Sequence, residues 1–393
     1  MLKREWTVAG GFAVMLVIAA KLTVPASAAA ASACKNGFAP TGDDYGNTCC
    51  IEQLVADGFG GSICSTTRAR TLGKTIRRLE DFDNVPLPGP HSDPDFSIMS
   101  SRAKAEATST SGTTTQSSYT TIDGEGAGLI NAPDIVKLHS GGTALRIGGF
   151  VGVETIKQNL TDPTSGAGVE KDNTDTFKFG PMFWLSSGDA HIGGKLGFDI
   201  GSGKETAANG DSGNYRTNGL TIDLLAGRDL TLSDHRTGHS ARSSDPALSA
   251  TGGYRIALGL DGFLRYDHQQ IGQFTDTAGT AFGGEHSRML SGGGRLSLYE
   301  DIFRDGYILT PYAGISGGSV LSYDHQIDDP AGGAPVSLSL PGRGFASASA
   351  GLRVEDANGI IVGLEGYHGG GAGTVETGGR VYLQFDLDRP ASH

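Results

Sequence analysis

The sequence has little of what several common protein classes need. Its 393 residues include 31 lysines and arginines against 43 acidic residues, so the formal net charge is −12. Nucleic-acid binding needs a basic face, and this balance excludes it as a main function. Aromatic residues make up only 7% of the chain, and its 62 glycines follow no Gly-X-Y period, which argues against both a tightly packed helical protein and a collagen. Beyond residue 33 no apolar run approaches the roughly 20 residues of a membrane-spanning helix. A membrane location would therefore have to use strands.

Motifs for catalysis are also missing. The chain has no Gly-x-Ser-x-Gly elbow, no His-Glu-x-x-His and no phosphate-binding loop. The sequence Tyr-Asp-His-Gln occurs twice, at 266–269 and 323–326. Adjacent Asp and His side chains point to opposite faces of a strand, which favours polar residues at the end of a strand over a shared site. We predict no enzyme and no cofactor, and a hydrolase site that uses Asp267 or His325 is the remaining enzyme hypothesis.

The first 33 residues have the pattern of a secretory signal peptide. Lys3 and Arg4 precede an apolar stretch at 6–20, and small residues offer cleavage sites before residue 34. An uncleaved membrane anchor is the alternative, but the apolar run is short and Lys21 interrupts it. A lipoprotein signal is a second alternative because Cys34 follows Ala-Ser-Ala, although the usual upstream leucine is absent.

Residues 34–83 form a small cysteine-containing segment, a candidate short passenger. An even number of cysteines in an exported chain predicts two disulfides, whose pairing stays open, although a bond between the two adjacent cysteines is disfavoured. A zinc site is the alternative, but no histidine lies among them. The segment ends in a predicted basic amphipathic helix at 66–82, which has either a solvated face or a lipid-bound one. The candidate disulfide residues are Cys34, Cys49, Cys50 and Cys64.

Residues 84–127 are rich in proline and then in serine and threonine. Such a composition cannot bury a core, so we predict a flexible linker. A β-barrel is predicted to follow over 128–393. The stretch at 128–140 would be either a short helix inside the pore or plain linker.

From residue 143 onward, segments of about ten residues alternate apolar with polar or small positions, which predicts an all-β fold. Twelve such segments precede or follow turn-rich stretches: 143–157, 176–186, 190–201, 215–226, 229–235, 250–260, 263–272, 286–299, 307–323, 344–354, 360–369 and 375–387. Short connections, among them 227–229 and 261–262, alternate with long polar ones, among them 236–249. This alternation is typical of a transmembrane antiparallel up-and-down barrel with periplasmic turns and extracellular loops.

The two faces of these segments differ in chemistry. One face is apolar, and a barrel of about 12 strands is too wide to fill with side chains, so the apolar face should contact lipid and the other a wet interior. The last strand should present Val381, Leu383, Phe385 and Leu387 to lipid and pair with the first strand at 145–153. The charges predicted to face the interior are Arg146, Lys178, Lys195, Asp199 and Arg255.

The barrel segments resemble the β-domain of the autotransporter family. The resemblance rests on "GGYRIALGLDGFLRYDHQQIGQFTDTAGTAF", "GGGRLSLYEDIFRDGYILTPYAGIS" and "ASAGLRVEDANGIIVGLEGYHGGGAGTVETGGRVYLQF", and it covers about 140–388. It implies a twelve-stranded barrel in the Gram-negative outer membrane, inserted by the barrel-assembly machinery and exporting an N-terminal passenger. It also implies an assembly signal in the last strand, at Tyr382 and Phe385, although eight residues follow Phe385 here.

These observations lead to one main hypothesis and two alternatives. The main one is a monomeric autotransporter-type barrel, surrounded by outer-membrane lipid, that translocates or displays its short N-terminal segment. The first alternative is a small porin-like or surface-antigen barrel whose N-terminal segment stays periplasmic. The second is the hydrolase at the barrel rim.

Overall fold

The computed structural model describes most of the second half of the chain and part of the first. The described residues are 41–42, 48–49, 54–56, 62–64, 95–111, 114–131, 134–140, 142–161, 168–207, 210–237, 252–279, 281–304, 306–328, 336–340, 342–356 and 359–385. The predicted signal peptide and the predicted helix at 66–82 lie outside these ranges.

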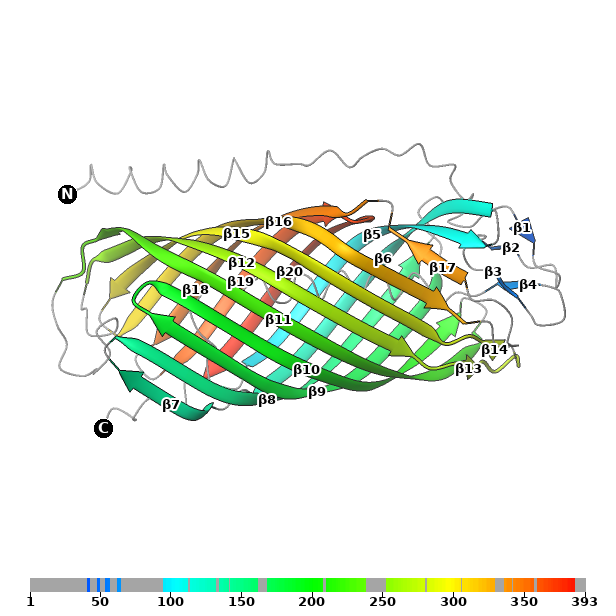
Figure 1. The fold of residues 1–393 in the computed structure, drawn as a ribbon, viewed down its shortest axis with the longest axis horizontal. Coiled ribbons are helices and arrows are strands. Elements are labelled where there is room, and N and C mark those ends of the chain that lie inside the picture. The colour runs from blue at the N-terminus through cyan, green and yellow to red at the C-terminus, as the bar shows by residue number, and fades with distance from the viewer. Residues whose placement is uncertain are drawn as a thin grey trace.

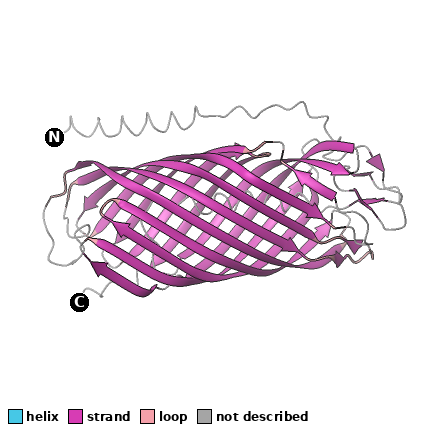
Figure 2. Cartoon of the chain, viewed as in Figure 1, coloured by secondary structure: helices cyan, strands magenta, loops and turns pink. Residues whose placement is uncertain are grey.

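Every regular element in the described part of the chain is a strand (Figure 2). Four are short strands of the N-terminal segment: β1 (Thr41–Gly42), β2 (Thr48–Cys49), β3 (Leu54–Ala56) and β4 (Ser62–Cys64). The long strands are β5 (Asp95–Ser111), β6 (Thr114–Asn131), β8 (Thr143–Thr161), β9 (Gly168–Ser187), β10 (Ala190–Ala207), β11 (Ser212–Asp234), β12 (Tyr254–Ile271), β15 (Glu285–Arg304), β16 (Tyr307–Ile327), β18 (Gly344–Asp356), β19 (Ile360–Gly371) and β20 (Thr374–Phe385). The remaining short ones are β7 (Asp134–Ser140), β13 (Phe274–Thr275), β14 (Ala281–Phe282) and β17 (Val336–Ser339).

The twelve long strands form a closed antiparallel barrel (Figure 1). Each pairs with the next long strand along the chain, and β20 closes the ring by pairing with β5, from Thr374 opposite Ala105 to Gln384 opposite Asp95. Closure removes both sheet edges, so almost every backbone polar group of the wall has a partner without water. The prediction of an all-β, twelve-stranded up-and-down barrel is confirmed.

Short strands complete the wall where the long strands are staggered. β7 continues β6 beyond Pro133 and pairs with the start of β8. At the other end β17 lies between β16 and β5. Among the described residues, no helix is long and apolar enough to cross a membrane.

The two ends of the barrel differ. We call the end where β20 stops, which holds the short turns at 188–189 and 305–306, the C-terminal rim. The opposite rim carries β13, β14 and β17, and the N-terminal strands β1–β4 are drawn at that same end (Figure 1).

The predicted linker is wrong from residue 95 onward. β5 and β6 are barrel strands, paired with each other from Asp95 opposite Ile130 to Ser111 opposite Thr114. The stretch at 128–140, predicted as pore helix or linker, forms the end of β6 and β7. A composition rich in serine and threonine predicts a tether, but these strands gain their order from hydrogen bonding to neighbours on both sides rather than from a buried apolar face.

Two predicted turns also prove to be strand. The predicted segments 215–226 and 229–235 are one strand, β11, and 250–260 and 263–272 are one strand, β12. The glycines of the two predicted turns lie in mid-wall on neighbouring strands, with Gly262 opposite Ala226 and Gly227 opposite Asp261. The sequence thus predicts β11 and β12 as two segments each and does not predict β5 and β6. The predicted number of twelve strands is correct, although the twelve predicted segments are not the twelve strands of the barrel.

These differences from the predicted strands also change the rim to which one connection belongs and the partner of the closing strand. The long connection predicted at 236–249 as an extracellular loop joins β11 to β12 at the C-terminal rim instead. The closing strand pairs with β5 rather than with residues 145–153, because β5 and β6 stand between β20 and β8.

Candidate functional site: the barrel interior

The barrel wall has an apolar outer face and a polar inner face. The outward side chains include many large hydrophobics that stay exposed, such as Val151, Val153, Phe177, Ile200, Leu224, Leu264, Leu352, Leu364 and Val381. The alternate positions on the same strands carry the buried carboxylates, among them Asp199, Asp223, Asp267, Glu285 and Glu365. In a soluble protein this arrangement would be inside out, whereas lipid on the outside stabilises it. The interior is therefore where polar chemistry gathers.

The predicted interior charges alternate with exposed apolar residues and mostly face acids. Lys178 Nζ lies 2.6 Å from Glu154 Oε2, and Lys195 Nζ lies 3.2 Å from Asp223 Oδ2. Arg146 is half-buried opposite Trp184 on β9. Asp199, on the inner face of β10, is 7% exposed. The fifth residue, Arg255, is part of the cluster near the C-terminal rim that is described below.

One ion-pair cluster lies toward the opposite rim. Lys195, Asp223 and Arg265 occupy one cross-strand row on β10, β11 and β12. Arg265 Nε lies 3.3 Å from Asp223 Oδ1 and 2.8 Å from Asp267 Oδ2. Thr221 donates a hydrogen bond of 2.9 Å to Asp267 Oδ1. Because Asp223 is fully buried, its charge depends on these two cations.

A second cluster lies midway along β12. His191 Nε2 is 2.9 Å from Asp261 Oδ1, and Arg295 Nη2 is 2.6 Å from the other oxygen of the same carboxylate. His191 and Asp261 sit on β10 and β12, with Gly227 of β11 between them. A Cβ at residue 227 would overlap both side chains, so only glycine lets them meet. The indole of Trp184 stacks on His191, with ring centroids 4.9 Å apart.

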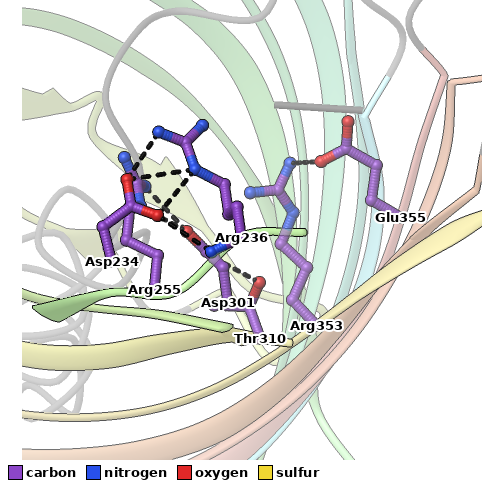
Figure 3. Close-up of polar contacts among 7 residues, drawn as sticks. All are labelled: Asp234, Arg236, Arg255, Asp301, Thr310, Arg353 and Glu355. Atoms are coloured by element: carbon purple, nitrogen blue, oxygen red, sulfur yellow. Dashed lines mark hydrogen bonds and ion pairs between the residues drawn. The ribbon is translucent and has the colours of Figure 1, made fainter. Parts of the chain in front are cut away.

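A third cluster lies near the C-terminal rim (Figure 3). Arg255 donates two hydrogen bonds to Asp301 Oδ2, of 3.0 and 2.7 Å, and Thr310 donates one of 2.8 Å to Asp301 Oδ1. Just beyond β11, Arg236 donates to Asp234, with Nη2 2.6 Å from Oδ2. The contacts of Asp301 join β12, β15 and β16 on the inner face, and Asp234 of β11 lies opposite Arg255 in the same row.

Further pairs extend this cluster along the rim. Arg353 Nη2 donates a 2.6 Å hydrogen bond to Glu355 Oε2 on the same strand, β18 (Figure 3). The Arg236 guanidinium carbon lies 5.9 Å from the centre of the Phe303 ring, a cation–π contact at this end of the barrel.

Tyrosines cross the inner face over glycines. Tyr312 of β16 lies over Gly351 of β18 and donates a 3.0 Å hydrogen bond to Glu365 of β19. Tyr382 of β20 lies over Gly363 in the same way. A Cβ at either glycine would overlap the tyrosine ring. Each pairing ties strands together from inside, beyond the backbone ladder.

The remaining predicted site residues are the four cysteines and the two residues of the assembly signal. Cys49 and Cys64 stand on β2 and β4, in two separate two-stranded ribbons, and the other two cysteines lie outside the described residues. Tyr382 is 2% exposed on the inner face, whereas Phe385 ends β20 opposite Ile360 and is half-buried. The predicted disulfides and the assembly signal stay predictions.

The two Tyr-Asp-His-Gln sequences face the interior in different ways. In β12, Asp267 is buried inside and belongs to the ion-pair cluster. In β16, His325 is the buried member; its Nδ1 lies 2.9 Å from Tyr323 Oη and its Nε2 lies 3.4 Å from Glu285 Oε2. Both ring nitrogens of His325 therefore have partners, and His325 lies two strands from the first sequence, in one row with Ser287 and Gln269.

Several central residues were not predicted from the sequence, among them His191, Arg295, Tyr312 and Glu365. Their signal was present as tyrosines and charges facing glycines on neighbouring strands. It could be used only with the strand register, which depends on knowing which turns exist. Among the described residues, no group of three or more His, Cys, Asp and Glu could hold a metal ion.

The central cluster predicts a sharp difference between two aspartates. Replacing Asp261 by alanine should destabilise the folded barrel by about 3–5 kcal/mol, because Arg295 would keep a buried charge without its nearest partner. The matched control is Asp189→Ala in the β9–β10 turn, where Asp189 lies 4.0 Å from Arg228 and both are exposed, and its effect should stay within about 0.5 kcal/mol. Urea unfolding in lipid vesicles measures both, and equal effects would contradict the role of the cluster.

Comparison with known proteins identifies solved structures of similar fold. No model of a protein family matches the chain, and no curated protein matches it. Among solved structures, the transport unit of the autotransporter AIDA-I from Escherichia coli aligns with a TM-score of 0.54 and 13% identity, covering 80% of this chain and 98% of that one. The translocator domain of NalP from Neisseria meningitidis aligns at 0.48 with 16% identity, covering 81% and 97%. The β domain of the Bordetella autotransporter BrkA aligns at 0.43 with 14% identity, covering 76% and 100%.

The named neighbours are transport barrels rather than enzymes. The first alignment spans nearly all of the AIDA-I transport unit. Because the sequence identity is only 13%, the alignment is evidence for a shared fold and for nothing more. With its closed twelve-stranded wall, apolar exterior and charged interior, the chain has the fold of an autotransporter transport unit.

Proposed function

We propose that the protein is an outer-membrane barrel of autotransporter type that carries its short N-terminal segment to the cell surface. The observation that carries the proposal is the placement of the N-terminal strands. β5 begins and β20 ends at the C-terminal rim, whereas β1–β4 lie at the opposite rim (Figure 1). The chain must therefore pass from one end of the barrel to the other between Cys64 and Asp95.

The connecting length is sufficient for that path. Residues 65–94 are 30 residues, which can span up to roughly 100 Å when extended. A barrel strand of about 20 residues covers roughly 66 Å along its own axis, and less along the tilted barrel axis. The same length would also allow a path outside the barrel, so the function must be tested on cells.

The proposal assigns roles to the remaining features. The C-terminal rim faces the periplasm, and the barrel-assembly machinery inserts β20 with Phe385 as part of its signal. The N-terminal cysteines form disulfides. The barrel works as a monomer without a catalytic step, and the paired interior charges stabilise its wall.

Protease treatment of intact cells tests the proposal. An epitope tag placed just before Cys34 should be lost while the folded barrel survives, because the N-terminal segment is outside. A second tag after His393 should stay protected at the periplasmic rim and become sensitive only in permeabilised cells. A protected N-terminal tag in cells whose 328–343 loop is cut would overturn the proposal and favour the porin-like alternative with a periplasmic segment.

A further inference from the structure

Four basic side chains lie on the outer surface of four consecutive strands toward the opposite rim. They are Lys157 of β8, Lys171 of β9, Lys204 of β10 and Arg216 of β11, and all four are exposed. Their sequence neighbours on the inner face are buried, which fixes the outward direction of the basic side chains. We name this set the outer basic ladder.

Strand register brings the members of the ladder together. Lys157 is opposite Asn173, two residues from Lys171 on the same strand. Lys171 is opposite Thr206, two residues from Lys204, and Lys204 is opposite Asn214, two residues from Arg216. Each cation is thus a diagonal neighbour of the next, at a spacing of about 7–8 Å. One extended anionic group could contact two of them at once.

Among the described residues, cations outnumber acids on this part of the outer face. Whereas the interior lysines and arginines lie beside acids, no member of the ladder forms an ion pair in the part of the chain that the structure describes. Two acids lie near it on this face: Glu125 of β6, directly opposite Lys157, and Asp175, opposite Ser202, which accepts a 2.8 Å hydrogen bond from Thr155. Two carboxylates do not balance four cations, so the local charge is positive, and like charges this close repel one another.

The ladder directly continues the lipid-facing surface. Val153, Phe177 and Ile200 form one apolar cross-strand row on β8, β9 and β10, and all three are exposed. Lys157 and Lys204 lie four residues farther along their strands, about 13 Å from that row. When the apolar row contacts hydrocarbon, the ladder lies at the height of the lipid head groups.

We propose that the outer basic ladder binds the phosphate groups of anionic lipid head groups. This inference rests on the proposed function, which makes the opposite rim the extracellular one and the ligand a phosphorylated glycolipid of the outer leaflet. Lysine and arginine donate charge-assisted hydrogen bonds to phosphate oxygens, and the amide groups of Asn173 and Asn214 lie in the same rows as further donors. The site would hold lipid against one sector of the barrel, from β8 to β11.

Binding of a defined lipid tests the site. The full-length protein in neutral detergent would be titrated with a diphosphorylated glycolipid (lipid A) and with the same lipid after removal of both phosphates. Lys171→Gln with Lys204→Gln should weaken binding of the phosphorylated lipid roughly thirtyfold, since each lysine near an anionic surface contributes about 1 kcal/mol. Inorganic phosphate at equal concentration should not compete, because it lacks the acyl chains that contact the apolar row.

A matched double variant controls for total charge. Lys104→Gln with Arg228→Gln removes two exposed, outward cations outside the ladder and should leave the affinity unchanged. Lys171→Arg with Lys204→Arg should bind like the original chain, and heat-modifiable migration confirms that each variant is folded. Equal weakening by both double Gln variants, equal affinity for the two lipids, or no weakening would overturn the site. Surface protease treatment tests translocation separately. A failure of lipid binding would therefore not contradict translocation, and a failure of translocation would not contradict phosphate binding by the ladder.

Discussion

A chain that begins at residue 128 should fail to form a closed barrel, whereas a chain that begins at residue 90 should form one. The shorter chain lacks β5 and nearly all of β6, which pair with β20 on one side and β8 on the other. Without them β8 and β20 would each leave an open edge in the membrane, where every unpaired backbone group costs several kcal/mol. Behind a heterologous signal peptide, heat-modifiable migration and outer-membrane fractionation should give full loss for the first chain and little change for the second.

This experiment separates two different positions for the start of the barrel. If 128–393 supplied the whole wall, as the sequence predicts, both chains would give a heat-modifiable band. A matched internal control keeps β5 and β6 but replaces residues 65–89 by a Gly/Ser linker of equal length; it should insert normally. Loss of the band in that control would show that the connecting segment itself is needed for assembly, and the role given to β5 and β6 would have to be revised.

The sequence predicts a linker where β5 and β6 stand, and the reason is physical. A strand in a soluble sheet must bury one apolar face, and the run at 108–121 has almost nothing to bury. In this barrel β5 and β6 carry polar residues on their outer face. Arg102 of β5 is one of them: its side chain is 70% exposed, and its Nε lies 2.7 Å from Asp123 Oδ1 of β6. The inner positions of the same strands are small residues such as Ser101 and Ala103. Hydropathy cannot tell such a strand from a tether, because its order comes from register with neighbours far away in the sequence.

The error over β11 and β12 has a different origin. Asp-Gly at 261–262 and Gly-Arg-Asp at 227–229 are strong local turn signals. In the structure Gly227 is glycine because Asp261 and His191 meet across it, so packing and not a turn selects the residue. The faces of β12 could still be predicted, since joining its two segments keeps the alternation intact, whereas β11 has a register shift between Thr231 and Ser233. The predicted interior position of Arg255 therefore did not depend on where the turns were placed.

Exchanging Gly363 for alanine should destabilise the barrel by about 1–3 kcal/mol, although it adds a single methyl group. The new Cβ would overlap the ring of Tyr382, which is 2% exposed and has the Arg380 guanidinium 5.2 Å from its centre. Either the ring must leave its position over β19 and lose its contacts, or the two strands must shift. Urea unfolding in lipid vesicles measures the loss of stability.

The control lies three residues away on the same strand. At Gly366 the nearest atom to an added Cβ is the Gly378 carbonyl oxygen at 4.0 Å, so Gly366→Ala should be neutral or slightly stabilising through the unfolded state. Combining Gly363→Ala with Tyr382→Ala should cost less than the sum of the two single changes, because the overlap disappears with the ring. Additive costs would mean that the ring and the glycine do not interact.

The same variants separate packing from assembly at β20. If Tyr382 acts only through its contact with Gly363, then Tyr382→Ala should lower stability but leave the amount of inserted barrel unchanged, as Gly363→Ala should. If Tyr382 is also read during assembly, then Tyr382→Ala should reduce insertion while Gly363→Ala does not. Phe385 lies on β20 without this glycine contact, so a loss of insertion in Phe385→Ala with unchanged unfolding of the inserted fraction would assign the assembly signal to that residue.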